Sequence, residues 1–168
     1  MEPKLTHVFT LRARIARDSV YLGSDSAGFQ KQITALEGGF FLGVPNTRGE
    51  GMNATLVPGG SDWVLFDPVT QVAHIDVRTQ GKLPDGSGVS VQYTGYLLVD
   101  EKAKRFMARG PNARSTEFGD HHWWTRPVIE TSAPQFKWTE STVFVGHGRC
   151  CLENDERMVE YQILEVGV

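Results

Sequence analysis

Apolar and polar residues alternate along much of this 168-residue chain, with the period of two that is typical of half-buried β-strands. Residues 7–15 are a clear case, because Phe9 and Leu11 fall on one side of the segment and Arg12 and Arg14 on the other. Further strands are predicted at residues 31–36, 61–66, 72–79, 89–99, 127–132, 141–146 and 158–166. The 18 glycines and 8 prolines that separate these short segments favour an all-β sandwich or barrel.

Four segments are expected to connect or bend the strands. Residues 18–29 are polar and contain glycine, so they predict a loop, and residues 58–60 (PGG) predict a turn. Asp85-Gly86 stands between two alternating runs and predicts a hairpin. Residues 37–43 place glycines beside bulky aromatics, which is expected where a strand bends at a barrel corner or bulge.

One helix is predicted, from Asp100 to Arg109. Asp100 is a suitable N-cap, strong helix formers follow it, and Gly110-Pro111 ends the segment. Its apolar stripe of Ala103, Phe106 and Met107 is expected to pack on the core. The helix should lie outside the barrel.

A row of charged side chains marks the strand at residues 72–79. His74, Asp76 and Arg78 share one face of it, whereas Ala73, Ile75 and Val77 share the other. A solvated outer face and a polar-lined internal cavity both produce this pattern, and alternation alone does not choose between them.

Composition narrows the function. A formal net charge of −3 and the scattered basic residues argue against nucleic acid or an anionic membrane as the main partner. The chain has no apolar run of membrane-spanning length, and Arg12, Arg14 and Arg17 interrupt its beginning, so a cytoplasmic protein is expected. Cys150 and Cys151 are adjacent, which fits a reducing compartment.

Other residues are candidates for a site. Residues 112–124 run from polar to doubly aromatic, which suggests a lid or cavity rim with Trp123 or Trp124 packing on a ligand. The adjacent His121 and His122 lack metal-ligand spacing, so no metal is expected. Glu130 lies among apolar neighbours and is either an internal carboxylate or an edge-facing one.

The order of several motifs resembles the DUF3237 (UPF0311) family of small β-barrel proteins. The motifs are ITALEGGFFLG (33–43), PGGSDW (58–63), IDVR (75–78), DG (85–86), VIET (128–131), KW (137–138) and TVFVG (142–146), and together they span nearly the whole chain. Two positions depart from the family pattern: Thr79 follows Arg78 where tyrosine is usual, and Thr139-Glu140 follow Trp138 where Leu-Asn is usual.

This resemblance implies a single domain, residues 1–168, that forms one closed antiparallel calycin-like barrel with an internal cavity. The charged row is then expected to face inward. Fungal members of the family are associated with aromatic polyketide pathways, in which some resemble cyclases that close an oxygen ring.

The leading hypothesis is a cofactor-independent cyclase or isomerase that works by general acid–base catalysis. Its expected substrate is a phenolic polyketide, either with or without a prenyl group. Asp62 or Glu130 is the candidate acid, because an apolar wall raises the pKa of a carboxyl group, and Asp76 is the candidate base, held ionised by Arg78. The candidate substrate-binding residues are Arg48, Trp63, His74, Tyr93, Tyr96, Trp123, Trp124 and Trp138. For the tyrosines, burial against a backbone partner is the alternative.

The rival hypothesis is a barrel that binds or carries a hydrophobic aromatic metabolite and transforms nothing. A structural partner for another pathway enzyme is a third reading, which leaves the polar row unexplained. No nucleotide loop, nucleophile elbow or metal cluster is recognisable, so no cofactor is expected. The expected partner is a small aromatic molecule, and a homodimer is compatible with the sequence.

Overall fold

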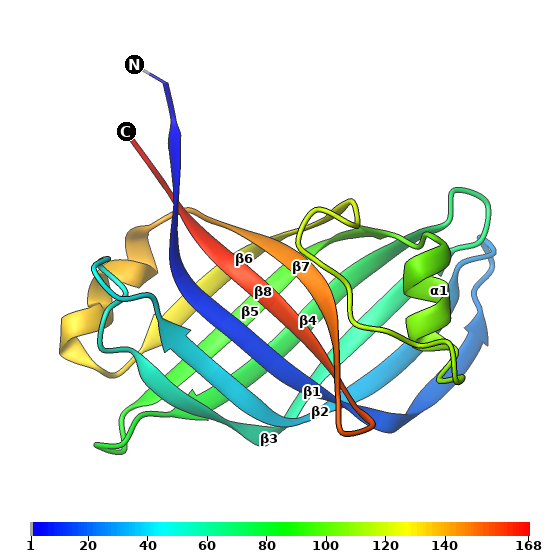
Figure 1. The fold of residues 1–168 in the computed structure, drawn as a ribbon, viewed down its shortest axis with the longest axis horizontal. Helices are drawn as coiled ribbons and strands as arrows, with labels where there is room; N and C mark the ends of the chain where they lie inside the picture. Colours follow the sequence, from blue (N-terminus) through cyan, green and yellow to red (C-terminus); the bar gives the residue numbers. More distant parts are fainter. Residues whose placement is uncertain (1) are drawn as a thin grey trace.

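The computed structural model describes residues 2–168, whose strands form a closed barrel (Figure 1). The strands are β1 (Lys4–Ser24), β2 (Gln30–Gly43), β3 (Asn53–Asp67), β4 (Val72–Lys82), β5 (Gly88–Leu98), β6 (Trp123–Thr131), β7 (Phe144–Glu153) and β8 (Glu156–Gly167). Each strand pairs antiparallel with its sequence neighbour, and β8 pairs back onto β1, so the strands close into a ring. The β6–β7 contact is the shortest ladder, with Trp124 opposite His147 and Thr125 opposite Gly146. The prediction of an all-β, closed antiparallel barrel with one short α-helix is confirmed. Among the described residues, no helix has the length and apolar character needed to cross a membrane.

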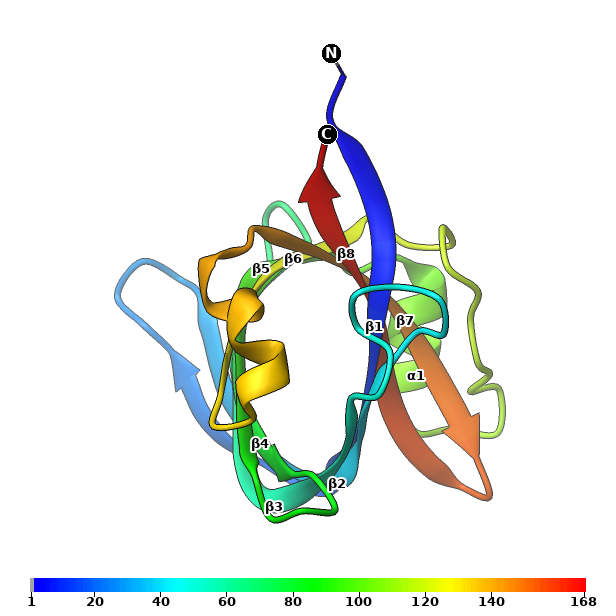
Figure 2. The same ribbon diagram turned by 90° about the vertical axis from the view of Figure 1, so that its left-hand side faces the viewer.

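The hairpin between β1 and β2 is longer than the sequence suggested. Residues 18–24 were expected to belong to a loop, but they continue β1, and only a short turn separates them from β2. In this turn the Asp25 side chain accepts the backbone N–H groups of Ala27 and Phe29, at 2.9 and 3.0 Å. The hairpin projects past the neighbouring strands and so lengthens this part of the barrel wall (Figure 2).

Two bulges bend the sheet at one place. Gly38 and Gly39 have φ angles of +129° and +135° and interrupt the β2–β3 register, as the corner prediction anticipated. The predicted turn at residues 58–60 was wrong, because this segment is a second irregularity inside β3, between Val57 and Ser61. Gly60 also permits close packing, since a Cβ atom there would lie 2.6 Å from the Arg78 carbonyl oxygen.

The two ends of the barrel differ. A 3-10 helix, η1 (Pro134–Ser141), covers one end (Figure 2), where the Trp138 ring stacks on Phe9 with centroids 5.7 Å apart. Helix α1 (Glu101–Met107) lies outside the opposite end, as predicted (Figure 1). Asp100 caps it by accepting the Ala103 N–H at 2.8 Å.

Candidate functional site

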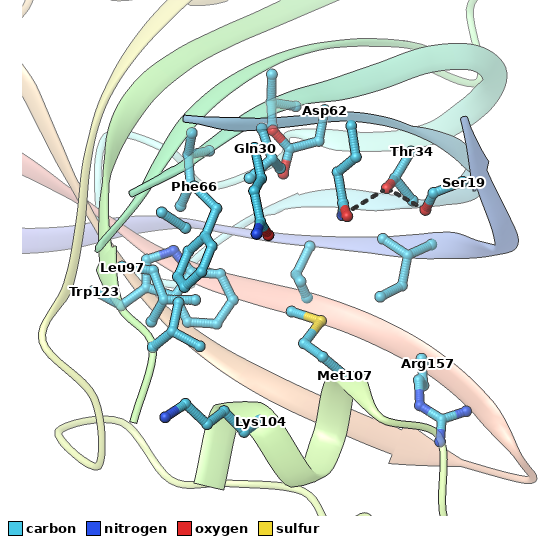
Figure 3. A pocket seen from close by; sticks show the side chains of 18 of the residues that line it. Ser19, Gln30, Thr34, Asp62, Phe66, Leu97, Lys104, Met107, Trp123 and Arg157 are labelled. Carbon is cyan, nitrogen blue, oxygen red and sulfur yellow. Dashed lines mark hydrogen bonds between the residues drawn. The ribbon is translucent and has the colours of Figure 1, made fainter. Parts of the chain in front are cut away.

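A cavity of about 600 Å³ occupies the α1 end of the barrel. Its walls are mainly apolar and include Val64, Phe66, Ala73, Ile75, Val77 and Leu97, whose side chains point inward from β3, β4 and β5. Helix α1 contributes Met107 to the side that faces Asp62 (Figure 3). A volume of this size suits a small organic ligand of several rings.

Asp62 is the one acidic side chain among the described residues that line this cavity. It lies on the inner face of β3, and in the ladder with β4 it stands opposite Val77. The backbone N–H of Asp76 donates to Asp62 Oδ1 over a long 3.4 Å. Burial raises the pKa of the Asp62 carboxyl to about 7. The hydrogen bond from Asp76 lowers this pKa, and the negative charge of Asp76 raises it. The group can therefore be protonated or ionised near neutral pH.

Three aromatic side chains with polar tips line the same cavity as Asp62. Tyr93 lies on β5, Trp123 on β6 and Tyr161 on β8, and all three are nearly fully buried and line the cavity. The Tyr161 ring lies 4.9 Å from the Tyr93 ring and 5.4 Å from the Trp123 ring, between centroids. Because the charge of Asp62 raises the pKa of both tyrosines, its carboxyl lies within electrostatic reach of their hydroxyls.

Two of these tips, the Tyr93 hydroxyl and the Trp123 indole N–H, are covered and make no hydrogen bond of good geometry within residues 2–168. The Tyr161 hydroxyl lies within weak hydrogen-bonding reach of both, and after the larger effect of burial, which raises the pKa of Tyr93, this contact lowers it. A buried donor without a partner costs free energy, so such groups are rare and call for an explanation. Burial raises the pKa of Tyr93 and of Tyr161 well above the usual range, so both hydroxyls keep their protons at neutral pH. The cavity wall therefore holds a carboxyl group of adjustable charge and two donors whose polar atoms are covered.

The charged row does not belong to this site. Asp76 and Arg78 are exposed on the outer face of β4, and the half-buried His74 lies there too, between Phe29 and Tyr96. The prediction that the row faces inward was wrong, because apolar side chains of the same strand fill the inner face. Asp76 and Arg78 thus lack the access to the cavity that catalytic roles require.

The same alternation turns four other candidates outward. Trp63 is 57% exposed next to the inward Asp62, and Tyr96 is 52% exposed on β5. Glu130 is exposed on β6, between buried neighbours, so the edge-facing alternative holds for it. Trp124 stacks on His147 outside the barrel, with centroids 4.2 Å apart, while its neighbour Trp123 points inward.

Two further candidates lie at the opposite end of the barrel. Trp138 packs between Phe9 and Phe144 in the aromatic layer beneath η1, and the Arg48 guanidinium lies 4.0 Å from the Trp138 ring centroid. Arg48 also pairs with Glu165. These two candidates therefore close this end of the barrel and do not line the cavity.

Within residues 112–122, the buried His121 and Thr116 belong to a polar network. His121 Nδ1 lies 2.7 Å from Asp100 Oδ2, and its Nε2 lies 3.0 Å from Thr116 Oγ1. Thr116 Oγ1 also accepts the Cys150 N–H at 3.0 Å, so the hydroxyl is fully engaged. The order of acid, histidine and hydroxyl imitates a nucleophilic triad, but these groups do not line the cavity. Within residues 2–168, no group of three or more potential metal-ligating His, Cys, Asp or Glu side chains occurs.

Sequence reasoning missed several cavity residues. Tyr161 belongs to a strand that was predicted only as a closing element, and its even alternation with Val159 was the available signal. Five basic residues also line the cavity: Arg17, Lys31, Lys104, Arg109 and Arg157. Nothing in their spacing indicated that they meet, because they come from four distant segments.

Comparison with known proteins identifies the family of this chain. Residues 3–166 match the family described as "Protein of unknown function (DUF3237)". The chain belongs to the DUF3237 family. A UPF0311 protein of Rhodopseudomonas palustris is 26% identical over 140 residues, which are 83% of this chain and 84% of that protein. The crystal structure of that DUF3237 relative superimposes on this chain with a TM-score of 0.75 and 24% identity. The match covers 99% of this chain and 100% of the relative's chain.

Two similar proteins come from Penicillium. The "PR-toxin biosynthesis cluster protein 7" of Penicillium roqueforti is 26% identical over 137 residues, which are 80% of this chain and 71% of that protein. A crystal structure described as that of an enzyme from Penicillium herquei has a TM-score of 0.61 and 15% identity, and covers 99% of this chain and 96% of its own. At that identity the second likeness shows only that the DUF3237 barrel is shared.

Proposed function

We propose that this protein is a cyclase or isomerase of an apolar, phenolic secondary metabolite, and that Asp62 is its proton-transfer group. The observation that carries the proposal is a carboxyl group with a pKa of about 7, the one acidic group among the described residues that line an apolar cavity whose wall also holds the Tyr93 hydroxyl and the Trp123 N–H. A general acid or base works best when its pKa lies near the working pH. A relative named for a toxin biosynthesis cluster supports a role in secondary metabolism.

One carboxyl group suffices for an intramolecular addition. In the proposed reaction, protonated Asp62 gives its proton to an alkene carbon of the substrate, and the phenol oxygen of the same molecule bonds to the resulting cation. The phenol proton then passes to the Asp62 carboxylate, which restores the acid. The product is an isomer of the substrate with a new oxygen ring, and no electrons are gained or lost. This scheme replaces the acid–base pair that was expected from Asp62 and Asp76.

The donors contribute by orienting the substrate. In the proposal, the side chains of Tyr93 and Trp123 turn toward the ligand and donate to a substrate oxygen other than the attacking phenol oxygen, which places the reacting atoms near Asp62. The apolar walls keep water scarce, so the cation is captured by the substrate's own oxygen.

The alternative function is a carrier that binds the same class of molecule without changing it. The mainly apolar lining favours this reading. The experiment compares turnover of an alkenyl phenol and its binding for wild type, Asp62→Asn and the matched outer-face control Asp76→Asn. Turnover lost in Asp62→Asn alone, by roughly 10²–10⁴-fold with binding kept, supports the enzyme. Tight binding by all three proteins without product above the spontaneous reaction supports the carrier.

A further inference from the structure

Three arginines with no acidic partner meet at the mouth of the cavity. Arg17 comes from β1, Arg109 follows α1, and Arg157 belongs to β8. All three line both the cavity and a second, polar groove that adjoins it, so they stand where the two spaces meet. Arg157 is seen beyond Met107 in Figure 3, on the side of the cavity away from Trp123.

The other basic residues of the cavity are neutralised, and these three are not. Lys31 lies 3.6 Å from Asp25, and Lys104 lies 3.2 Å from Glu101. Among residues 2–168, no carboxylate lies within salt-bridge distance of Arg17, Arg109 or Arg157. Such a concentration of positive charge is notable in a chain whose formal net charge is −3.

Backbone contacts hold two of the guanidinium groups in place. Arg109, with φ of +56°, donates through Nη2 to the Ala16 carbonyl at 2.5 Å, and Arg157 donates through Nε to the Phe106 carbonyl at 2.9 Å. Each guanidinium has five N–H donors, so most of them remain available. Partial burial lowers the pKa of Arg157, and the charges of Arg109 and Arg17 lower it further, against a smaller opposing effect of Asp155, so Arg157 is repelled by both of the other arginines.

We propose that Arg17, Arg109 and Arg157 form a subsite for an oxyanion group of the ligand, whose aromatic body extends into the cavity toward Asp62. The inference rests on the proposed use of this cavity for substrate, and it adds that the substrate is an acid rather than a neutral phenol. A carboxylate or a phosphate ester would relieve the repulsion and accept forked hydrogen bonds from guanidinium groups. A neutral molecule would leave the positive cluster uncompensated.

The test uses matched probes that share one ring system: 2-naphthoate, its neutral methyl ester and 2-naphthyl phosphate. Binding is measured by calorimetry for wild type, Arg17→Gln and Arg105→Gln. Arg17 is the primary variant because, within residues 2–168, its side chain makes no hydrogen bond, so its loss should not disturb the fold. Arg105 is an exposed arginine of α1 that does not line the cavity.

Wild type should bind at least one anion roughly tenfold or more tightly than the ester, since a charge-assisted hydrogen bond contributes about 1.5–3 kcal/mol and tenfold is about 1.4 kcal/mol. Arg17→Gln should remove most of this preference and leave ester binding unchanged, while Arg105→Gln should behave as wild type. Preference for naphthoate identifies a carboxylic acid, and preference for the phosphate identifies a phosphate ester. Equal binding of anions and ester by wild type, no binding of any anion, or a preference that survives in Arg17→Gln overturns the subsite.

Failure of this subsite is distinguishable from failure of catalysis. Asp62→Asn should retain the preference for the anion, because Asp62 lies in the barrel wall and not in the arginine cluster. A protein that binds anions selectively but turns nothing over keeps the subsite and loses the cyclase. A protein that turns over a neutral phenol but shows no preference for anions keeps the cyclase and loses the subsite.

Discussion

Asp62 stands opposite Val77 in the β3–β4 ladder, and both side chains enter the cavity, whereas Asp76, next to Val77 in the chain, points to solvent. Among the described residues, this pairing leaves Asp62 as the one carboxyl that lines the cavity. In the proposed reaction the proton must therefore return to Asp62 within one turnover. A single titrating group with a pKa of about 7 makes this requirement testable.

We expect kcat/KM to depend on pH through one ionisation of Asp62. Because the proposed first step needs the protonated acid, kcat/KM should be flat at low pH and should fall about tenfold per unit above a pKa of about 7. A rate profile from about pH 5 to 9 measures this. A rate that rises through this range instead would show that the carboxylate acts first, as a base. A profile that is unchanged in Asp62→Asn would exclude Asp62 as the titrating group.

Asp62→Asn should also stabilise the fold, but only at pH values where wild-type unfolding releases the Asp62 proton. The pKa of Asp62 is raised in the folded protein, so the native state keeps a proton that the unfolded chain releases above pH 3.8. Wild type therefore loses stability as pH rises from about 4 to about 7, and the variant lacks this loss. The shift in the Asp62 pKa corresponds to at most about 4 kcal/mol in the free energy of unfolding, and solvent screening makes the effect smaller. We therefore expect Asp62→Asn to raise the free energy of unfolding by roughly 1–3 kcal/mol.

Urea unfolding at about pH 4 and about pH 8 checks this gain, which should appear only at the higher value. The exposed Asp76→Asn is the control for removing a negative charge from the same pair of strands. An equal gain in both variants, or at both pH values, contradicts a buried ionisable Asp62.

Alternation in the sequence predicted the strands of an all-β sandwich or barrel, and the family resemblance indicated the barrel, but neither showed correctly which face of each strand turns inward. It separated Ala73, Ile75 and Val77 from the charged row correctly, yet the family's internal cavity suggested a polar lining and assigned the wrong face. The inner polar groups instead include Asp62, Tyr93 and Trp123, each on the inner face of a different strand. Their meeting depends on the register of β3 through β6, which pattern alone does not supply.

The bulges and the arginine cluster illustrate the same limit. Pro58-Gly59-Gly60 has the composition of a turn, and only pairing with β2 and β4 keeps it within one strand. Arg17, Arg109 and Arg157 come together because β1, the segment after α1 and β8 share one end of the barrel. Such long-range contacts carry no local sequence signal.

His121→Ala should reduce stability and leave catalysis intact. The change leaves Asp100 and Thr116 without their His121 partner in a buried position, so we expect a loss of roughly 2–4 kcal/mol in the free energy of unfolding. The neighbouring His122 is exposed, and His122→Ala should change stability by less than about 0.5 kcal/mol. Thermal unfolding measures both. A loss of turnover in folded His121→Ala, well below its melting temperature, would assign the network to the chemistry after all.

Gly39→Ala should be far more damaging than Gly38→Ala. Both glycines have φ near +130°, so alanine strains the backbone equally at either site. At Gly39 the new Cβ would also lie 1.9 Å from the Arg12 carbonyl oxygen, whereas at Gly38 the nearest atom is 3.5 Å away. We expect a loss of about 1–3 kcal/mol for Gly38→Ala from strain alone, and a larger loss or failure to fold for Gly39→Ala. Equal losses in chemical denaturation would mean that β1 and β2 can separate at the bulge without cost.

Tyr93→Phe should separate stability from function at the cavity. The Tyr93 hydroxyl is buried without a partner, so removing it takes away an unsatisfied polar group and keeps the ring that packs against Tyr161. We expect stability to be unchanged or higher by up to about 1 kcal/mol. If the hydroxyl donates to the substrate oxygen, turnover should fall by roughly 10²–10³-fold, which is the usual cost of losing one such donor.

The control is Tyr96→Phe, which removes an identical hydroxyl from the outer face of the same strand, where the side chain is 52% exposed. It should alter neither turnover nor binding. A carrier predicts a different pattern, in which Tyr93→Phe weakens binding of a phenolic ligand and no product forms in any variant. If Tyr93→Phe instead loses stability, its hydroxyl has a partner in solution, such as a bound water, and is not reserved for a ligand. Unfolding and turnover measured on the same three proteins therefore decide whether the unpartnered hydroxyl serves catalysis, binding or the fold.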